Sequence, residues 1–405
     1  MALVVQKFGG TSVGDAERIR AVADHVARTR EAGNDVVVVV SAMGKFTDDL
    51  IRLADDVSPT RPPRELDMLL TAGERISMAL VCMALADRGV ESASFTGSQA
   101  GIITDSDHTR AKILEMRPDR IREALDAGLV PVVAGFQGVS TEKDITTLGR
   151  GGSDVTAVAL AAALKADVCE IYTDVTGVFS ADPRVVSQAR RIPKVSFDEM
   201  MEIAATGGRV LMLRSVEFAR RHGVPLHVRS SFTWEPGTWI VEEDPTMEEA
   251  VVSAVTDDKS EAKVTVGGVP DRPGIAAHLF RQLSNGGVNV DMIVQNTSAN
   301  GMTDISFTVS KTDLDTARTI CDRVKSDIGA AEVTSDDSIG RVSIVGAGMK
   351  SSPGVTALMF ETLSENGINI EMISTSSIRI SCVVRADRVA DAVRCLHTAF
   401  GLDAA

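Results

Sequence analysis

Residues 1–245 alternate short apolar strands with longer stretches of helical periodicity. Leu3–Phe8 is rich in β-branched residues, and residues 15–30 repeat apolar positions at the spacing of one helical face. Residues 36–40 are valine throughout, which is typical of a parallel strand covered by helices on both sides. The alternation predicts an α/β fold with an open, mostly parallel sheet covered by helices. Further strands are expected at 130–135, 168–173 and 226–231, and further helices at 69–86, 154–165 and 197–205.

The last third of the chain contains an internal repeat with an offset of 80 residues. Residues 271–275 (Asp-Arg-Pro-Gly-Ile) align with residues 351–355 (Ser-Ser-Pro-Gly-Val), and apolar, glycine and asparagine positions match beyond them. Each copy has the pattern of a strand, a Pro-Gly turn, a helix, two strands and a second helix. A repeat of this length predicts two small domains rather than a solenoid.

An acidic stretch that contains a proline, residues 242–249, separates the two parts of the chain. Such a break predicts a linker. We therefore expect a first domain at 1–245, a linker at 246–262, and the two repeated domains at 263–338 and 339–405.

Composition and charge exclude several classes of protein. The formal net charge is −14 and the sequence has no run of Lys or Arg, which argues against a nucleic-acid partner. The longest purely aliphatic stretch, residues 36–40, is far shorter than the roughly 20 residues that span a bilayer. No basic region precedes the first apolar residues, and the five cysteines form no CxxC pair. We expect a cytoplasmic protein with no membrane partner.

A glycine-rich turn follows the first expected strand. Gly9 and Gly10 can expose backbone N–H groups to an anion at a helix start, and Lys7 adds a full positive charge. Taken alone, the turn could need glycine only for its backbone geometry. The turn lacks the GxxxxGK[ST] spacing of a Walker A phosphate-binding loop. Residues 10–14 fit the G-x-S-x-G pattern of hydrolases, but they follow the first strand rather than several, which argues against that class.

A second cluster, Gly149 to Asp154, opens the Ala-rich helix with three glycines, an arginine and a Ser-Asp pair. These groups suit recognition of a carboxylate or phosphate. The alternative is that Ser153 caps the helix and Asp154 offsets its dipole. A helix cap needs one such residue rather than a cluster of six. We therefore favour recognition of a carboxylate or phosphate by this cluster. Thr173 and Asp174 end a strand, at the edge of the sheet where nucleotides bind.

In this order, the motifs resemble those of the aspartate kinases, and the two Pro-Gly repeats resemble the tandem ACT domains of that family. The motifs lie at residues 7–12, 73–74, 149–154 and 173–184, so the resemblance covers essentially the whole chain. It implies an amino-acid-kinase fold followed by two α+β, ferredoxin-like ACT domains. It also implies ATP-dependent phosphorylation of the L-aspartate β-carboxylate to 4-phospho-L-aspartate, the first step of lysine, threonine and methionine biosynthesis.

The resemblance also implies roles for individual residues. Lys7 would stabilise charge on the transferring phosphoryl group, Arg150 would clamp an aspartate carboxylate, and Glu74 and Asp154 would hold the ammonium. Glu74 alone could instead compensate a helix dipole. Mg²⁺ is expected to arrive with ATP, so no protein metal cage is required. The other residues implied for aspartate are Ser41, Thr47 and Ser153, and those implied for ATP are Phe8, Gly9, Gly10, Thr173, Asp174, Phe179, Asp182, Arg184, Arg209 and Val210.

Three positions depart from the pattern of the family. Phe179 stands where a tyrosine is usual, so a phenolic hydrogen bond is lost while ring packing remains. Arg209 stands where a lysine is common, which keeps the charge but changes its geometry. Residues 45–47 (Lys-Phe-Thr) replace a more polar loop. None of these departures involves Lys7 or the Arg150 cluster, so activity is expected.

The repeats are expected to bind an amino acid effector, lysine or threonine, where the ACT domains of two chains pair. Helix-end amides can take its α-carboxylate while Asp271 takes its ammonium. The second copy has Ser351 in place of Asp271, so we expect stronger contacts from the first copy. Alternatively, the Pro-Gly turns only start helices and the repeats only dimerise. The residues expected at the seam are Asp271, Pro273, Gly274, Ile275, Ala276 and Gln295 from the first copy, and Val355, Asn369 and Ile370 from the second.

Two other functions stay open at the level of sequence. Another carboxylate kinase of the same superfamily, acting on acetylglutamate or glutamate, would keep the glycine-rich turn without requiring Glu74, the Arg150 cluster and two ACT copies together. A non-catalytic amino-acid sensor would keep the ACT pair without needing Lys7 and Arg150. Met247 could also start a separate regulatory subunit. We therefore expect a homo-oligomer, or an assembly of α and β subunits, formed through the ACT domains.

Overall fold

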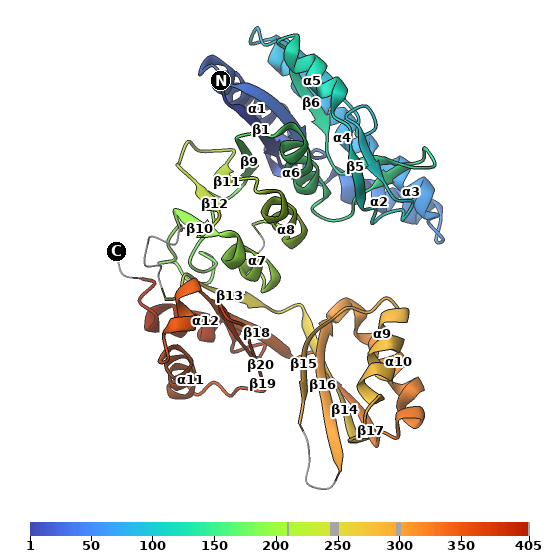
Figure 1. Ribbon diagram of the computed structural model, residues 1–405, viewed down its shortest axis with the longest axis vertical. Coiled ribbons are helices and arrows are strands. Elements are labelled where there is room, and N and C mark those ends of the chain that lie inside the picture. The colour runs from blue at the N-terminus through green and yellow to red at the C-terminus, as the bar shows by residue number, and fades with distance from the viewer. Residues whose placement is uncertain (209, 244–250, 297–300, 404–405) are drawn as a thin grey trace. The chain divides into compact units, whose positions relative to one another are not determined.

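The computed structural model describes residues 1–208, 210–243, 251–296 and 301–403, with residues 350 and 351 described by their backbone alone. These residues form two compact units (Figure 1). The first unit contains the described residues of 1–178, 191–204 and 210–243. The second contains those of 179–190, 205–208 and 251–403.

The first unit is built on an eight-stranded sheet with the order β10-β12-β11-β9-β1-β2-β6-β3. All neighbouring strands pair in parallel except β11 and β12. This arrangement confirms the predicted α/β class. The strands are β1 (Leu3–Phe8), β2 (Asp35–Val40), β3 (Ser92–Phe95), β6 (Val130–Ala134), β9 (Val168–Thr173), β10 (Lys194–Ser196), β11 (Leu226–Ser230) and β12 (Thr238–Val241).

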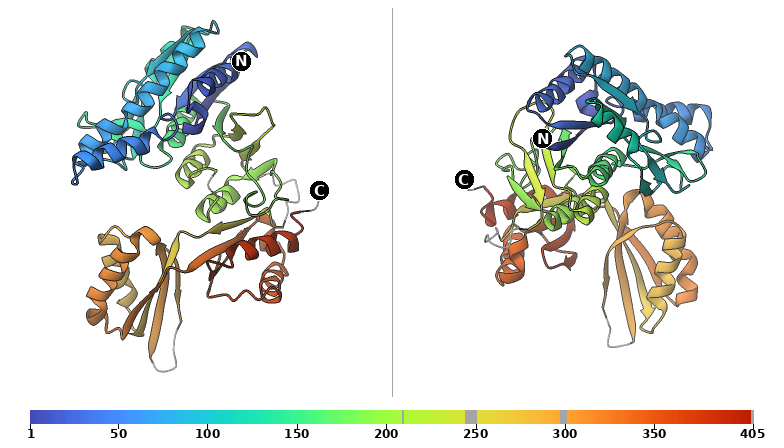
Figure 2. Two further views of the ribbon diagram at one scale, coloured as in Figure 1. Left: turned by 180° about the vertical axis from the view of Figure 1, so that it is seen from behind. Right: turned by 45° about the horizontal axis from the view of Figure 1, so that its top comes forward.

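Helices cover both faces of this sheet, as the all-valine strand β2 predicts. Val36, Val38 and Val40 pack in one core with α1 (Ala16–Glu31) and α4 (Ala72–Ala86), which lie side by side (Figure 2). The alternate valines are equally buried on the opposite face, where α6 contacts β1 and β2. The remaining helices are α2 (Phe46–Val57), α3 (Pro63–Leu70), α5 (Asp119–Asp126), α6 (Gly152–Leu164), α7 (Phe197–Ala205) and α8 (Leu213–His222).

A second, smaller sheet in the first unit is absent from the sequence-based prediction. It has four strands in the order β5-β4-β7-β8. Each strand has only three or four residues, which is too short to establish a period of two. The strands are β4 (Ile102–Thr104), β5 (Ile113–Met116), β7 (Gln137–Ser140) and β8 (Ile145–Thr147).

The stretch Pro63–Ala86, which contains α3 and α4, is long and apolar enough by length and composition to cross a membrane. Half of its most apolar window is nevertheless buried inside the protein. It also carries buried Asp67, whose carboxylate accepts hydrogen bonds from Thr109 N–H at 3.1 Å and from the Thr147 hydroxyl at 2.5 Å. Because the buried Asp67 carboxylate is bonded by Thr147 of the small sheet, these helices are part of the protein core.

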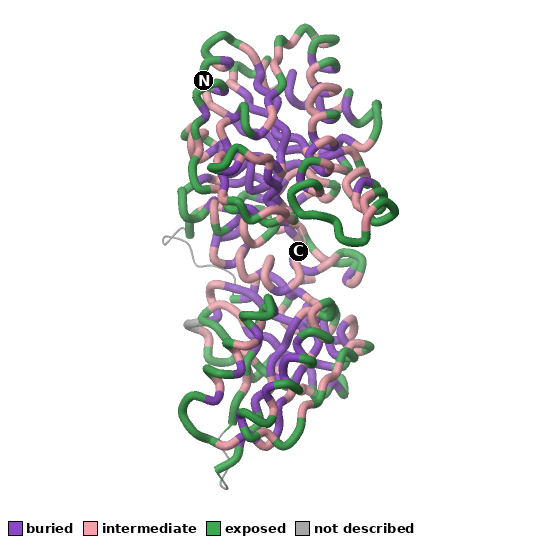
Figure 3. The backbone as a smooth tube through the Cα atoms, turned by 90° about the vertical axis from the view of Figure 1, so that its right-hand side faces the viewer, coloured by how far each residue is buried: buried purple, intermediate pink, exposed green. Residues whose placement is uncertain are grey.

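The second unit contains two antiparallel four-stranded sheets, and buried positions recur along their strands. Figure 3 marks the buried residues of the chain in purple. Both repeats show the predicted order of strand, helix, two strands and helix. The first repeat contains β14 (Glu261–Pro270), α9 (Ile275–Asn285), β15 (Val290–Gln295), β16 (Met302–Ser310), α10 (Leu314–Ile328) and β17 (Glu332–Asp336). The second contains β13 (Ala254–Asp258), β18 (Ile339–Val345), α11 (Val355–Glu365), β19 (Met372–Thr375), β20 (Arg379–Arg385) and α12 (Val389–Ala399).

Two features differ from the expected division of the chain. Strand β13 lies inside the expected linker 246–262 and pairs with β18 at the edge of the second repeat's sheet. The first repeat is therefore inserted between β13 and the rest of the second repeat. Residues 179–190, expected within the first domain, belong to the second unit. Sequence periodicity could not show either feature, because both depend on pairing between segments far apart in the chain.

Candidate active site

The glycine-rich turn and the Arg150 cluster, which are predicted separately, lie together in the first unit. Lys7 is near the end of β1, and Asp154 is in the first turn of α6. Lys7 Nζ is 2.6 Å from Asp154 Oδ1, and the two side chains are only 11% and 10% exposed. Because β1 pairs in parallel with both β2 and β9, their carboxyl ends also meet at this edge. The ion pair therefore lies where the fold is expected to bind a nucleotide.

The loop after β2 packs directly against the glycine turn. Gly44 N–H donates to Gly10 O at 2.9 Å, and a Cβ on Gly10 would lie 2.9 Å from Ala42 O. A side chain at Gly10 would therefore push this loop away. Gly9 N–H donates to Tyr172 O at 3.2 Å, so this amide is engaged within the fold. This differs from the expectation that it faces the phosphates.

Glu74 is a buried carboxylate in the first turn of α4, and only 3% of the residue is exposed. Its Oε1 accepts a hydrogen bond from Ala42 N–H at 3.1 Å. Its Oε2 is also buried and has no hydrogen-bond partner among the described residues. Burial raises the pKa of Glu74 to about 7. Compensation of the helix dipole would not require burial, so this geometry favours an incoming cationic group such as an ammonium.

The start of α6 is shaped by glycine rather than by a side-chain cap. Gly151 is the N-cap with φ +71°, and a Cβ there would lie 2.2 Å from Met212 Cγ. Ser153 is inside the helix and buried, so the alternative that it caps α6 is wrong. Arg150 is exposed and forms no ion pair with any residue that the structure describes. The cluster thus carries an exposed guanidinium four residues before Asp154 of the buried Lys7–Asp154 pair.

The remaining first-unit residues lie at strand and helix ends. Ser41 follows β2 and donates its N–H to Phe8 O at 3.1 Å, and Thr47 is in the first turn of α2. Thr173 ends β9, and its hydroxyl donates to the exposed Asp174 carboxylate at 3.2 Å. Val210 is half-buried, and Arg209 lies outside the described residues.

Ser231 is a candidate that the sequence analysis missed. It follows β11 and donates both its N–H and its hydroxyl to Thr173 O, at 2.9 and 3.2 Å. Its Oγ also accepts a hydrogen bond from the Ser12 hydroxyl at 2.8 Å. The residue therefore links the ends of β9 and β11 to the 3₁₀ turn Gly10–Val13. The rule that selects Thr173, binding at the carboxyl ends of parallel strands, applies equally to β11.

The other predicted nucleotide residues belong to the second unit. Phe179 is half-buried, and Asp182 and Arg184 follow it in the segment 179–190. Arg184 Nη2 donates to Asp182 Oδ2 at 2.6 Å, and Nε contacts the same carboxylate. Their charges therefore offset each other.

The predicted effector residues lie at the ends of helices and strands of the repeats. Gly274 is the N-cap of α9 with φ +99°, and Asp271 and Pro273 beside it are exposed. Ile275 and Val355 differ from expectation, because both side chains are buried in the cores of their own repeats. In contrast, the side chains of Gln295 and Asn369 are exposed, and those of Ala276 and Ile370 are partly exposed.

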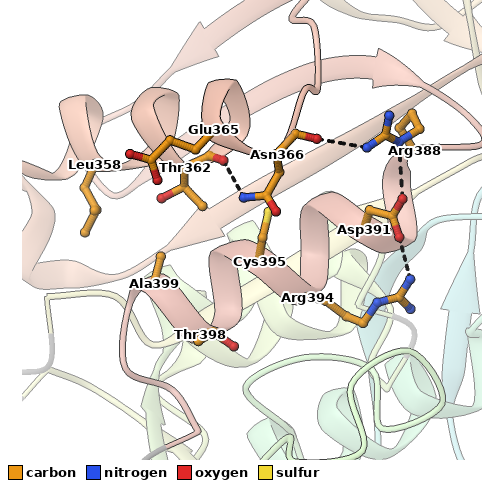
Figure 4. A pocket seen from close by; sticks show the side chains of 10 residues that line it. All are labelled: Leu358, Thr362, Glu365, Asn366, Arg388, Asp391, Arg394, Cys395, Thr398 and Ala399. Atoms are coloured by element: carbon orange, nitrogen blue, oxygen red, sulfur yellow. Dashed lines mark hydrogen bonds and ion pairs between the residues drawn. The ribbon is translucent and has the colours of Figure 1, made fainter.

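A pocket of about 690 Å³ lies between α11 and α12 of the second repeat (Figure 4). Three of its charged groups are paired within it, since Asp391 accepts from both Arg388 and Arg394. Arg388 also donates to Asn366 O at 3.0 Å. No predicted site residue lines this pocket, so it is separate from the candidate active site.

Comparisons with known proteins agree with this geometry. Residues 2–230 match the model of the amino acid kinase family, and residues 264–323 and 342–400 match an ACT domain model. The fold and the site therefore define an amino acid kinase that carries two ACT domains.

Relatives over the full length give a narrower assignment. Aspartokinase from Mycolicibacterium smegmatis is 59% identical over 407 residues, covering 99% of this chain and 97% of the relative. Aspartokinase III from E. coli, solved in complex with aspartate and ADP, is 25% identical with a TM-score of 0.83, covering 98% of this chain and 99% of the other. Its complex with lysine and aspartate is 27% identical with a TM-score of 0.73 and the same coverage. The chain belongs to the aspartokinase family and is an aspartate kinase.

Proposed function

We propose that phosphoryl transfer takes place beside the Lys7–Asp154 pair, where the ATP γ-phosphoryl group meets the β-carboxylate of L-aspartate. This proposal rests on one observation: the buried Lys7–Asp154 ion pair lies at the carboxyl ends of the neighbouring parallel strands β1, β2 and β9. The complex of the E. coli relative with aspartate and ADP supports the choice of substrates.

Each residue has a role that follows from charge and burial. Both substrates are anions, so the reaction depends on positioning and charge neutralisation more than on a side-chain nucleophile. Lys7, held by Asp154, stabilises the negative charge of the transferring phosphoryl group. Glu74 Oε2 and Asp154 take the aspartate ammonium, and Arg150 takes a carboxylate. Ser41, Thr47 and Ser153 complete the substrate side of the site.

We assign the nucleotide to Thr173, Asp174, Phe179, Asp182 and Arg184, together with the turn residues Phe8 to Gly10. No group of three or more potential metal ligands occurs in the described part of the chain, so a protein metal cage is not part of this proposal. The exposed Asp174 carboxylate suits a Mg²⁺ ion that enters with ATP. The ion supplies neutralisation of the phosphate charge when bound. Arg209 and Val210 stay predicted nucleotide contacts.

We further propose feedback inhibition by lysine, threonine or both at the ACT domains of paired chains. The complex of the E. coli relative with lysine supports an amino acid effector. Asp271 gives the first repeat a countercharge for the effector ammonium. Cytoplasmic location, the domain boundaries 1–245, 263–338 and 339–405, and assembly through the ACT domains are parts of the same proposal. Met247, proposed as an internal start, lies outside the described residues.

Hydroxamate formation tests the reaction, because hydroxylamine traps an acyl phosphate. We expect ATP-dependent product with L-aspartate and none with N-acetylglutamate. Lys7→Ala should lower kcat about 100- to 1000-fold, since it removes the charge that stabilises the transferring group. Lys112→Ala, at an exposed lysine next to β5, is the matched control and should keep wild-type kcat. Turnover of N-acetylglutamate, or full activity of Lys7→Ala, would refute the proposal.

A further inference from the structure

The segment Phe179–Arg190 lies between β9 and β10 in the chain but packs into the second ACT repeat. Ala181 and Val186 are 4% and 7% exposed and belong to the core that α12 and β18 form. The same short segment carries Asp182 and Arg184, which we assign to the nucleotide. The core of the ACT repeat therefore anchors the segment that carries these two residues of the proposed ATP site.

Ser180 fixes this segment through all of its polar groups. Its N–H donates to Arg190 O at 2.8 Å, and its carbonyl accepts from Val255 N–H of β13 at 2.7 Å. Its Oγ accepts from Arg190 N–H at 2.9 Å and lies 2.9 Å from His397 Nε2. The side chain of Arg190 also bonds the segment to the second repeat, because its Nε donates to Leu402 O at 2.8 Å.

His397 is fully buried in α12, and both of its ring nitrogens are bonded. Nδ1 contacts the Asp403 carboxylate, which can only accept, so the partners assign the proton to Nδ1. Nε2 is then the acceptor for the Ser180 hydroxyl. A hydrogen bond from the Thr398 hydroxyl lowers the pKa of Asp403, and the bond with His397 lowers it further. Each hydrogen bond in this series therefore donates toward Asp403: the Arg190 N–H donates to Ser180 Oγ, the Ser180 hydroxyl to His397 Nε2, and His397 Nδ1 to the Asp403 carboxylate.

Serine, histidine and aspartate in this sequence of bonds also form the triad of serine hydrolases. That role is excluded here by burial. Ser180 is 3% exposed and His397 is 0% exposed, so no substrate can reach the hydroxyl. The arrangement can position the backbone but cannot attack an ester.

We propose that His397, oriented by Asp403, is a positioning residue for the nucleotide, because it holds Ser180 and with it the segment that carries Asp182 and Arg184. This inference rests on the proposed assignment of those two residues to ATP. The residues assigned to aspartate, Glu74, Arg150 and Asp154, belong to the first unit. The effect of His397 is therefore specific for one of the two substrates.

The experiment measures the KM values for ATP and for aspartate separately, in the full chain. Ser180→Ala and Asp403→Ala should each raise the KM for ATP about 5- to 10-fold, the range of one lost hydrogen bond. The KM for aspartate should stay within twofold. Asp403 is partly exposed and follows α12, so its variant is expected to fold even where one at the buried His397 does not. Arg394→Ala, on the exposed side of the same helix, is the matched control and should change neither KM.

A KM for ATP within twofold of wild type in both variants would overturn the inference. An equal rise in both KM values would also overturn it, because that result indicates general loosening of the protein. Failure of the proposed assignment of Asp182 and Arg184 to ATP gives a different result, namely an Arg184→Ala variant whose KM for ATP equals that of the wild type.

Discussion

Glu74 keeps an acidic group in the interior with only one of its two oxygens bonded to the protein. Burial opposes its ionisation, which is why its pKa is about 7 rather than the ordinary 4.5. An ammonium ion beside Oε2 would favour the charged form again. In the proposed role of Glu74, substrate binding and ionisation of this carboxyl group are therefore linked.

This linkage predicts how affinity for aspartate depends on pH. As the pH falls below about 7, Glu74 gains a proton and can no longer attract the ammonium, so the KM for aspartate should rise. Glu74→Gln should have a KM about 10-fold or more above wild type and lack this pH dependence. Steady-state kinetics from pH 6 to pH 8.5 measure both. A wild-type KM that stays constant over this range would contradict the role of Glu74.

The same group affects stability in the absence of substrate. A raised folded pKa means that the folded state binds the proton more tightly than the unfolded state does. The contribution is fully present below the unfolded value of 4.5 and is lost as the pH rises through about 7, by roughly 3 kcal/mol. Unliganded wild-type protein should therefore lose most of this stability between pH 4.5 and pH 7, and Glu74→Gln should lose less. Urea denaturation at the two pH values measures the difference.

At the level of secondary structure, sequence periodicity predicted long elements well and short or distant ones poorly. β1, β9 and α7 have the expected bounds, because a run of β-branched residues or a helical face is a local property. The small sheet was missed because strands of three or four residues have no measurable period. β13 was missed because the residues of its partner β18 lie 83 to 91 positions further along the chain, and local patterns do not encode such pairing.

The candidate site shows the same difference between local features, which the sequence predicts, and long-range contacts, which it does not. Lys7, Glu74 and the 149–154 cluster could be selected from sequence, because glycines and charges at helix starts have a local physical meaning. Their juxtaposition could not, since it requires the order of strands in the sheet. The engagement of the Gly9 amide by Tyr172 O was also beyond local patterns, because these two residues are far apart in the chain.

The start of α6 offers a test at the same scale. Gly151 and Gly128 both have positive φ, at +71° and +79°, but only Gly151 has close neighbours, whereas a Cβ on Gly128 would meet open space. Either substitution by alanine should cost about 1–2 kcal/mol of stability through its backbone conformation. Only Gly151→Ala should also displace the Arg150 cluster and lower kcat/KM for aspartate about 10- to 100-fold. Equal activities of the two variants would show that the N-terminus of α6 need not be shaped so tightly.

At the scale of the whole molecule, Arg341 of β18 joins parts of the second unit that are far apart in sequence. The residue is 1% exposed, and its guanidinium donates to Ala205 O at 2.9 Å. It also contacts Glu261 Oε1 at 2.8 Å and the Asp291 carboxylate, both of the first repeat. A single buried cation therefore holds the two repeats to each other and to Ala205 of the same unit.

Removal of that cation should be costly. Arg341→Ala leaves buried Glu261 without its counterion, and we expect it to lower the free energy of unfolding by about 3–5 kcal/mol. Arg385→Ala, on the same sheet but with a 45% exposed side chain paired with Asp336, should cost less than about 1 kcal/mol. Chemical denaturation of the two variants measures the difference. Similar losses would indicate that Arg341 is not the link between the repeats.

The insertion of one repeat within the other also has a consequence for protein synthesis. β13 leaves the ribosome before the whole first repeat, yet its partner β18 is made only afterwards. The last contacts of the 179–190 segment, with Leu402 and Asp403 through Arg190 and His397, come from the end of the described chain. A polypeptide that ends before α12 therefore lacks the groups that bond Ser180 and Arg190 from the second repeat, so these contacts of the 179–190 segment form only after that repeat has been made.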